Sequence, residues 1–235
     1  MRDIKPYEKE ERNTKMRWGM VIDLSKCMRC HACIVACRAE HFLPLGMLWD
    51  RLIAWEETAE EITTYPVRCN HCKEPPCVYV CPTEASQKRE SDGIVWIDQN
   101  KCVGCRYCTI ACPYQNRQFM GKDKDTGYFP GYALTDFEKA GKRLYPHTIG
   151  TNEKCNFCME RIDAGLAKGL KPGVDRDATP ACVNTCQARA MTFGDLDDIN
   201  SDVRRLIRDY KGFQLHPEYD TDPSIYYIDK GRRGV

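Results

Sequence analysis

Cysteines are the residues of this sequence whose number and spacing point to chemistry. The chain of 235 residues contains 16 of them, and they fall into four groups of four with none left over. The groups are Cys27, Cys30, Cys33 and Cys37; Cys69, Cys72, Cys77 and Cys81; Cys102, Cys105, Cys108 and Cys112; and Cys155, Cys158, Cys182 and Cys186. Thiols repeated at such short intervals are typical of metal centres.

The spacing within a group indicates iron–sulfur chemistry. Three cysteines separated by two residues each lie on a loop that curls around one face of a cube of iron and sulfide, with backbone N–H groups aimed at the negative cluster. We expect the fourth cysteine to start a helix and to bind a second cluster, as in the C-x2-C-x2-C-x3-C-P pattern of ferredoxins. The proline of that pattern follows Cys81 and Cys112. Each group would then give three ligands to one cluster and one to its neighbour.

Two other uses of the cysteines fit less well. A zinc site needs pairs of thiolates that converge from two knuckles, whereas the groups that begin at Cys27 and Cys102 each place three evenly spaced cysteines within seven residues. A disulfide scaffold belongs to a secreted chain, whereas the segment Met1–Arg17 is highly charged and lacks the apolar stretch of a signal peptide. The sequence therefore predicts iron, held by all sixteen cysteines in four clusters.

The distances between groups predict the fold. Only 20 residues separate the second group from the third. Their sequence predicts a helical turn and a hairpin closed at Asp92–Gly93, with a strand at Ile94–Ile97. These two groups form one two-cluster unit, and the first and fourth groups form a second unit that the first one interrupts. We therefore expect an α+β fold of two bacterial-ferredoxin-like domains, one inserted into the other. The ranges are 16–60 with 150–200 for the outer domain, 61–115 for the inserted one, 116–149 for an interface loop and 201–235 for a C-terminal extension.

Several elements outside the cysteine groups can be placed. Strands are expected at Met20–Leu24 and Ala190–Phe193, and a helix at Glu160–Leu166. A C-terminal helix should run from Asp202 to Lys211, with Ser201 as its N-cap and Gly212 as the residue that stops it. The aromatic and glycine-rich stretch 116–151 shows no clean periodicity and reads as an ordered surface loop.

Composition excludes several classes of protein. The net charge is +1, which argues against a nucleic-acid binder. No stretch approaches 18 apolar residues, so no membrane-spanning segment is expected. The chain has no glycine-rich dinucleotide loop and no nucleophile motif, so we expect no catalytic residues and no enzyme activity of its own.

Some residues beside the cysteines have two interpretations. Lys26 and Lys101 precede the first cysteine of a group, and His31 and His71 lie between ligands. They either tune the cluster potentials by charge or hydrogen bonding, or they are solvated loop residues. For the two histidines the solvated interpretation is favoured.

The fourth group carries a family resemblance. The segments CNFCMERIDAGL and TPACVNTCQARAMTFGDLDD resemble the fourth-group signature of the iron–sulfur subunits of complex iron–sulfur molybdoenzymes, the dimethyl-sulfoxide-reductase family. The tail LHPEYDTDPSIYYID is similar to the tetrathionate, polysulfide and sulfite-oxidising branches, and the resemblance covers roughly residues 16–230. It implies four sets of ligands: Cys27, Cys30, Cys33 with Cys186 (set 1); Cys69, Cys72, Cys77 with Cys112 (set 2); Cys102, Cys105, Cys108 with Cys81 (set 3); and Cys155, Cys158, Cys182 with Cys37 (set 4).

The resemblance also implies a role and partners. It implies four [4Fe–4S] clusters that transfer electrons between a large molybdopterin catalytic subunit and an integral membrane, quinone-reactive anchor subunit. The chain would be associated with the membrane peripherally, on the cytoplasmic face or in the periplasm after export with a partner. The alternative is an electron-transfer subunit of a hydrogenase- or carbon-monoxide-dehydrogenase-type complex. We assign the long segments 116–151, 159–181 and 196–235 to partner interfaces, and the alternative for these segments is that they only shield the clusters from water.

Overall fold

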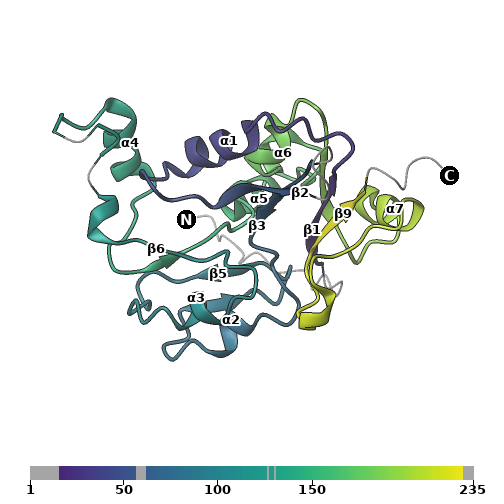
Figure 1. Cartoon of the computed structure of the whole chain (residues 1–235), viewed down its shortest axis with the longest axis horizontal. Helices are drawn as coiled ribbons and strands as arrows, with labels where there is room; N and C mark the ends of the chain where they lie inside the picture. Colours follow the sequence, from purple (N-terminus) through teal and green to yellow (C-terminus); the bar gives the residue numbers. More distant parts are fainter. Residues whose placement is uncertain (1–15, 57–61, 126, 130, 230–235) are drawn as a thin grey trace, which may run out of the picture.

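Each cysteine group is entered from one β-strand and left by another. The computed structural model describes residues 16–56, 62–125, 127–129 and 131–229 (Figure 1). The strands are β1 (Trp18–Asp23), β2 (Asp50–Glu56), β3 (Ile62–Arg68), β4 (Ser86–Lys88), β5 (Val95–Ile97), β6 (Gln118–Phe119), β7 (Asn152–Glu153), β8 (Met191–Asp195) and β9 (Ile225–Ile228). Strands β1, β3, β5 and β7 lead into the four groups, and β2, β4, β6 and β8 follow them.

The strand pairing repeats around the molecule. The strand that leaves one group pairs antiparallel with the strand that enters the next, which gives the pairs β2–β3, β4–β5 and β6–β7. Strand β8, which leaves the fourth group, pairs antiparallel with β1, which enters the first. The chain is thus built from four similar strand–loop–helix–strand units, and the pairing of the last with the first brings its two distant parts together.

The helices are short and lie mostly at the cysteine groups. They are α1 (Ala32–His41), α2 (Pro76–Tyr79), α3 (Tyr107–Ala111), α4 (Asp136–Leu144), α5 (Met159–Leu166), α6 (Ala181–Thr185) and α7 (Asp202–Asp209), with 3-10 turns η1 (Lys122–Lys124), η2 (Arg176–Ala178) and η3 (Pro217–Tyr219). Helix α1 packs against α6, and α2 packs against α3. Figure 1 shows α1, α5 and α6 on one side of the molecule, and α2, α3 and β5 on the other. The fold is α+β, as the sequence predicts.

The expected start of a helix at the fourth cysteine of each group is wrong. In every group the third cysteine is instead the second residue of a helix, namely Cys33, Cys77, Cys108 and Cys182. The three residues between the third and fourth cysteines, taken with those cysteines, make about one helical turn. The helix therefore occupies that interval, and α2, α3 and α6 end before the fourth cysteine.

The strands and helices expected outside the groups are confirmed, with small shifts at their ends. Strands β1, β5 and β8, the hairpin β4–β5, and helices α5 and α7 lie where the sequence predicts them. The Ser201 hydroxyl accepts a hydrogen bond from the backbone N–H of Arg204, as an N-cap should. The end of α7 differs from the expectation. Lys211 is the residue with a positive φ, of 49°, and the next residue, Gly212, donates its N–H to the carbonyl of Ile207.

The stretch 116–151 is not a loop throughout. It contains β6 and the nine-residue helix α4, which begins with a capping box in which Thr135 and Glu138 exchange hydrogen bonds. A Thr followed three residues later by Glu is the sequence signal of such a helix start. The helix packs closely against the end of α1, because a Cβ added at Gly141 would lie 2.6 Å from the Cβ of Phe42.

The C-terminal residues close the fold from inside. Strand β9 adds to the central sheet parallel to β1, giving the order β8-β1-β9. Just before it, the backbone N–H of Ser224 donates to the carbonyl of Asn70, and the hydroxyl of Thr221 lies 2.6 Å from that of Tyr114. This part of the tail therefore covers the second cysteine group and joins it to the outer sheet, as in the shielding alternative.

Candidate iron–sulfur centres

The cysteines of the first three sets each line one cavity. Set 1 lines a cavity beside α1, with Met191 in its wall. Set 2 lines a cavity walled by Val95 and Tyr114, and set 3 lines one walled by Ile97 and Asn152. In each cavity, three cysteines of one group meet the fourth cysteine of another. The first group meets the fourth, and the second and third groups exchange their last cysteines.

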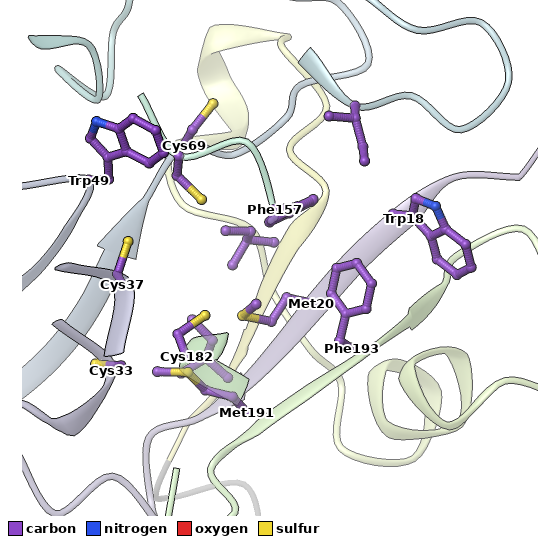
Figure 2. Close-up of a cluster of buried hydrophobic side chains, with 14 of the residues drawn as sticks. Trp18, Met20, Cys33, Cys37, Trp49, Cys69, Phe157, Cys182, Met191 and Phe193 are labelled. Atoms are coloured by element: carbon purple, nitrogen blue, oxygen red, sulfur yellow. The ribbon is translucent and has the colours of Figure 1, made fainter. Parts of the chain in front are cut away.

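The cysteines of set 4 lie in the interior. Cys37, Cys155, Cys158 and Cys182 are all buried. Burial raises the pKa of the Cys37 thiol well above its ordinary value, and the charges of Cys155, Cys158 and Cys182 raise it further, which places the four sulfurs near one another. Figure 2 shows Cys37 on the same helix as Cys33, with the buried side chains of Cys182, Cys69 and Phe157 in the same cluster.

Several of the buried thiols would stay protonated at neutral pH unless a metal bound them. Burial raises the pKa of Cys33, Cys72 and Cys155 to about 12. Iron binds the thiolate, so cluster binding must displace these protons. Among the residues described, no three His, Cys, Asp or Glu side chains form a site for a single metal ion.

The loops between the cysteines adopt a conformation that fits an anionic cluster. The residue before the second cysteine has a positive φ in all four groups: Arg29 (58°), His71 (43°), Gly104 (69°) and Phe157 (58°). Only one of these is glycine, although the left-handed region costs other residues about 1–2 kcal/mol. Successive N–H groups of a backbone that alternates between right- and left-handed conformations point to the same side and bind anions. The repeated strain therefore has a function if each loop surrounds a cluster.

Three buried cations lie next to the cysteines. Arg68 and Lys154 precede the first cysteine of the second and fourth groups, and Arg117 follows the third group. Lys26 and Lys101, at the matching positions of the other two groups, are exposed. The sequence shows a basic residue before every group, but it does not show which of them are buried.

The two histidines between ligands differ. His31 is exposed, whereas His71 is buried, so the solvated interpretation is wrong for His71. The His71 ring stacks on Phe157 with 3.7 Å between ring centroids, and its Nδ1 accepts a hydrogen bond from the N–H of Val95. Burial and the nearby charges of Lys154 and Arg117 lower the pKa of His71 well below its ordinary value, so the ring is neutral. His71 and Phe157 occupy the same position in the second and fourth groups, so their stacking joins these two groups.

Comparison with known proteins places these features in a family. Residues 61–127, which contain the second and third groups, match a family model described as a 4Fe-4S dicluster domain. The chain is 37% identical to a protein of Halobacterium salinarum that carries the provisional name of a dimethyl sulfoxide reductase iron–sulfur subunit, over 90% of this chain and 79% of that protein.

Two further relatives cover most of this chain. One is a subunit of the sulfite dehydrogenase of Allochromatium vinosum, 34% identical over 90% of this chain and 82% of the relative. The other is an iron–sulfur subunit of an Hdr-like menaquinol oxidoreductase of Archaeoglobus fulgidus, 35% identical over 94% of this chain and 87% of the relative. The three relatives are similarly identical to this chain, so the identities do not assign the chain to one branch of the family.

Proposed function

This chain belongs to the iron–sulfur subunits of the molybdoenzymes of the dimethyl-sulfoxide-reductase family, and we propose that it conducts electrons through four [4Fe–4S] clusters between a molybdopterin catalytic subunit and a quinone-reactive membrane subunit. A [4Fe–4S] cluster takes up and releases one electron at a time. The observation that carries the proposal is the arrangement of all sixteen cysteines in four sets of four. None of the helices among the residues described could span a membrane.

We assign one cluster to each of sets 1 to 4. The cavities support the assignment for sets 1, 2 and 3, because each is lined by the four cysteines of its set. The mutual influence of the four buried thiols supports it for set 4. The inserted and outer ferredoxin-like domains follow from this assignment. Sets 2 and 3 exchange cysteines within residues 61–115, and sets 1 and 4 exchange them between 16–60 and 150–200.

Contacts between the sets support a row in the order 1, 4, 2, 3. Sets 1 and 4 are neighbours because Cys33 and Cys37 lie one turn apart on α1. Sets 4 and 2 are neighbours because His71 stacks on Phe157. Sets 2 and 3 are neighbours because Arg117 lines the cavities of both. Sets 1 and 3 are then the ends of the row, where an electron enters and leaves.

Exposed apolar side chains surround both ends of this row. Met28 and Val35 lie beside set 1, and Val103, Tyr107 and Ile110 beside set 3. Cys30 and Cys105, the middle cysteines of the two loops, are also exposed. Apolar surface of this kind marks protein–protein contacts. It supports docking of one partner at each end.

Segment 127–149 offers another apolar surface. Phe129, Tyr132, Leu144 and Ile149 are exposed there. The segment is anchored to the end of α1, where the hydroxyl of Tyr128 donates to the carbonyl of Leu43 at 2.7 Å. We keep the assignment of this segment to a partner interface.

The metal content tests the cluster assignment. The chain purified alone without oxygen should contain about 16 iron and about 16 acid-labile sulfide, four of each per cubane. Zinc as the main metal, or iron near half that amount, would contradict four [4Fe–4S] clusters.

Surface substitutions test the two ends. Ile110 is 82% exposed and Met28 63%. Ile110→Glu and Met28→Glu should each weaken binding of a different partner in native purification, with iron content unchanged. Tyr79→Glu is the matched control, since Tyr79 is 68% exposed, lines none of the three cysteine cavities and lies outside the segments assigned to partner interfaces. Loss of the same partner in both variants, or in the control, would contradict entry and exit at opposite ends.

One relative favours a second candidate function. The Hdr-like menaquinol oxidoreductase subunit is about as similar to this chain as the sulfite dehydrogenase subunit. The second candidate is electron transfer in another redox complex, of the hydrogenase or carbon monoxide dehydrogenase type. Molybdenum in the complex purified from membranes supports the first function. Nickel, or a complex without molybdenum, supports the second.

A further inference from the structure

Arg117 is a buried cation between two of the cysteine sets. The residue is only 4% exposed, and it lines the cavities of both set 2 and set 3. Its Nη2 donates to the sulfur of Cys77 at 2.8 Å and to the hydroxyl of Ser86 at 2.7 Å. Cys108 lines the set 3 cavity together with Arg117 and also acts on the guanidinium. Cys77 belongs to set 2 and Cys108 to set 3, so one positive charge faces both.

The remaining donors of Arg117 have no partner. Its Nε and Nη1 are buried without a hydrogen bond. In the part of the chain that the structure describes, Arg117 forms no ion pair with a carboxylate. Burying an unpaired charge is costly. The buried guanidinium of Arg117 is stable at this position only if compensating negative charge lies in the two cavities.

Arg68 occupies the corresponding place between sets 1 and 4. The residue is 1% exposed, and its Nη1 lies 3.4 Å from the sulfur of Cys182, which belongs to set 4. The charge of Cys33, which belongs to set 1, also acts on it. A buried arginine therefore lies between sets 1 and 4, and another between sets 2 and 3.

The two arginines differ in one respect. Nη2 of Arg68 lies 2.9 Å from both carboxylate oxygens of Asp50, which is itself 2% exposed. This buried ion pair carries no net charge. Asp50 also acts on Cys33, so the carboxylate and the guanidinium influence the same thiol of set 1.

We propose that Arg117 is a positioning residue that raises the reduction potentials of the clusters of sets 2 and 3, and that Asp50 cancels the same effect of Arg68 on the clusters of sets 1 and 4. This inference rests on the proposed assignment of clusters to the four sets. Reduction adds a negative charge to a cluster, so a fixed positive charge nearby favours the reduced state. The field is strong because the site excludes water. The chain thereby holds an electron more tightly in the inserted half of the row.

Redox titration of the holoprotein, followed by electron paramagnetic resonance, tests the inference. Arg117→Gln removes the charge and keeps hydrogen-bond donors, and Arg117→Lys keeps the charge. We expect Arg117→Gln to lower two of the four midpoint potentials by at least about 59 mV. For a one-electron step this is a tenfold change in the equilibrium constant for reduction. Arg117→Lys should leave the potentials close to the wild-type values. Asp50→Asn frees Arg68 and should raise the other two potentials.

The outcomes separate this inference from the cluster assignment. Each variant is first analysed for iron, so a potential is compared only between chains that hold four clusters. If Arg117→Gln binds about 16 iron, four per cubane, and its potentials do not change, the inference is wrong. If Arg117→Gln loses iron, the Asp50→Asn variant still tests the inference. Unchanged potentials in Asp50→Asn would show that Asp50 does not cancel the effect of Arg68 on the clusters of sets 1 and 4. A wild-type chain without four clusters would overturn the proposed function itself.

Discussion

Replacing Gly104 by alanine tests whether the loop of the third cysteine group has the geometry described. Gly104 has a φ of 69°, and a Cβ at this position would lie 2.1 Å from the carbonyl oxygen of Gly150. That carbonyl belongs to backbone held in place, since the N–H of Gly150 donates to the carbonyl of Met120. The added methyl group therefore meets main chain and not a flexible side chain.

The cost can be worked out from these two features. A left-handed alanine costs about 1–2 kcal/mol relative to glycine. Relieving an overpacked contact adds about 1–3 kcal/mol. The total is about 2–5 kcal/mol, and since 1.4 kcal/mol is a factor of ten, about 2 kcal/mol corresponds to about 30-fold. If this strain is released when the loop opens, the cluster of set 3 should be lost to a chelator at least about 30-fold faster in Gly104→Ala.

The assay is the decay of visible absorbance in a chelator, with iron counted at the end. Arg29→Ala is the matched control, because Arg29 occupies the same place in the first group and already has a Cβ at a φ of 58°. It should change the rate only a few-fold. Loss of the set 3 cluster at the wild-type rate in Gly104→Ala would refute the reasoning. Equal damage by Arg29→Ala would show that any substitution in these loops is harmful.

Three further predictions concern ligand pairing, pH dependence and a helix cap. Cys37→Ser should destroy the cluster held by the fourth cysteine group and spare the cluster held by the first group, leaving about 12 iron per chain. Loss of the first-group cluster alone, seen by electron paramagnetic resonance, would contradict the crossed pairing. Burial lowers the pKa of His147, but the hydrogen bond and charge of Glu153, 2.9 Å away, outweigh it and raise the pKa overall. The stabilisation from this pair is therefore complete below about pH 6.5 and is lost as the pH rises through the raised pKa. The difference in melting temperature between wild type and His147→Gln should be larger near pH 6 than near pH 8.5. A difference that grows with pH would contradict this prediction. Ser201→Ala removes the cap of α7 and should lower stability by about 1 kcal/mol in thermal unfolding, with cluster potentials unchanged.

Some features required the structure even though a local signal was present. Helix α4 has its capping box at Thr135 and Glu138, but the lack of periodicity hid it. The helix holds its place through contacts with α1, which is distant in sequence. Strand β9 is a four-residue strand that exists because it adds to β1, more than 200 residues earlier. Short elements of this kind depend on tertiary partners more than on propensity.

The sequence by itself determined the chemistry of this chain. The ligands of one group lie within a short loop and one helical turn, so their spacing alone specifies iron–sulfur binding. Strands β1, β5 and β8 and helices α5 and α7 were equally readable, because their hydrophobic patterns and caps are local. The tertiary structure decided which charges face the cavities. Arg68 and Lys26 both precede a cysteine group, yet only Arg68 is buried. Burial is a property of what packs on a residue from elsewhere in the chain, and Asp50 and Arg117 acquire their importance only from that packing.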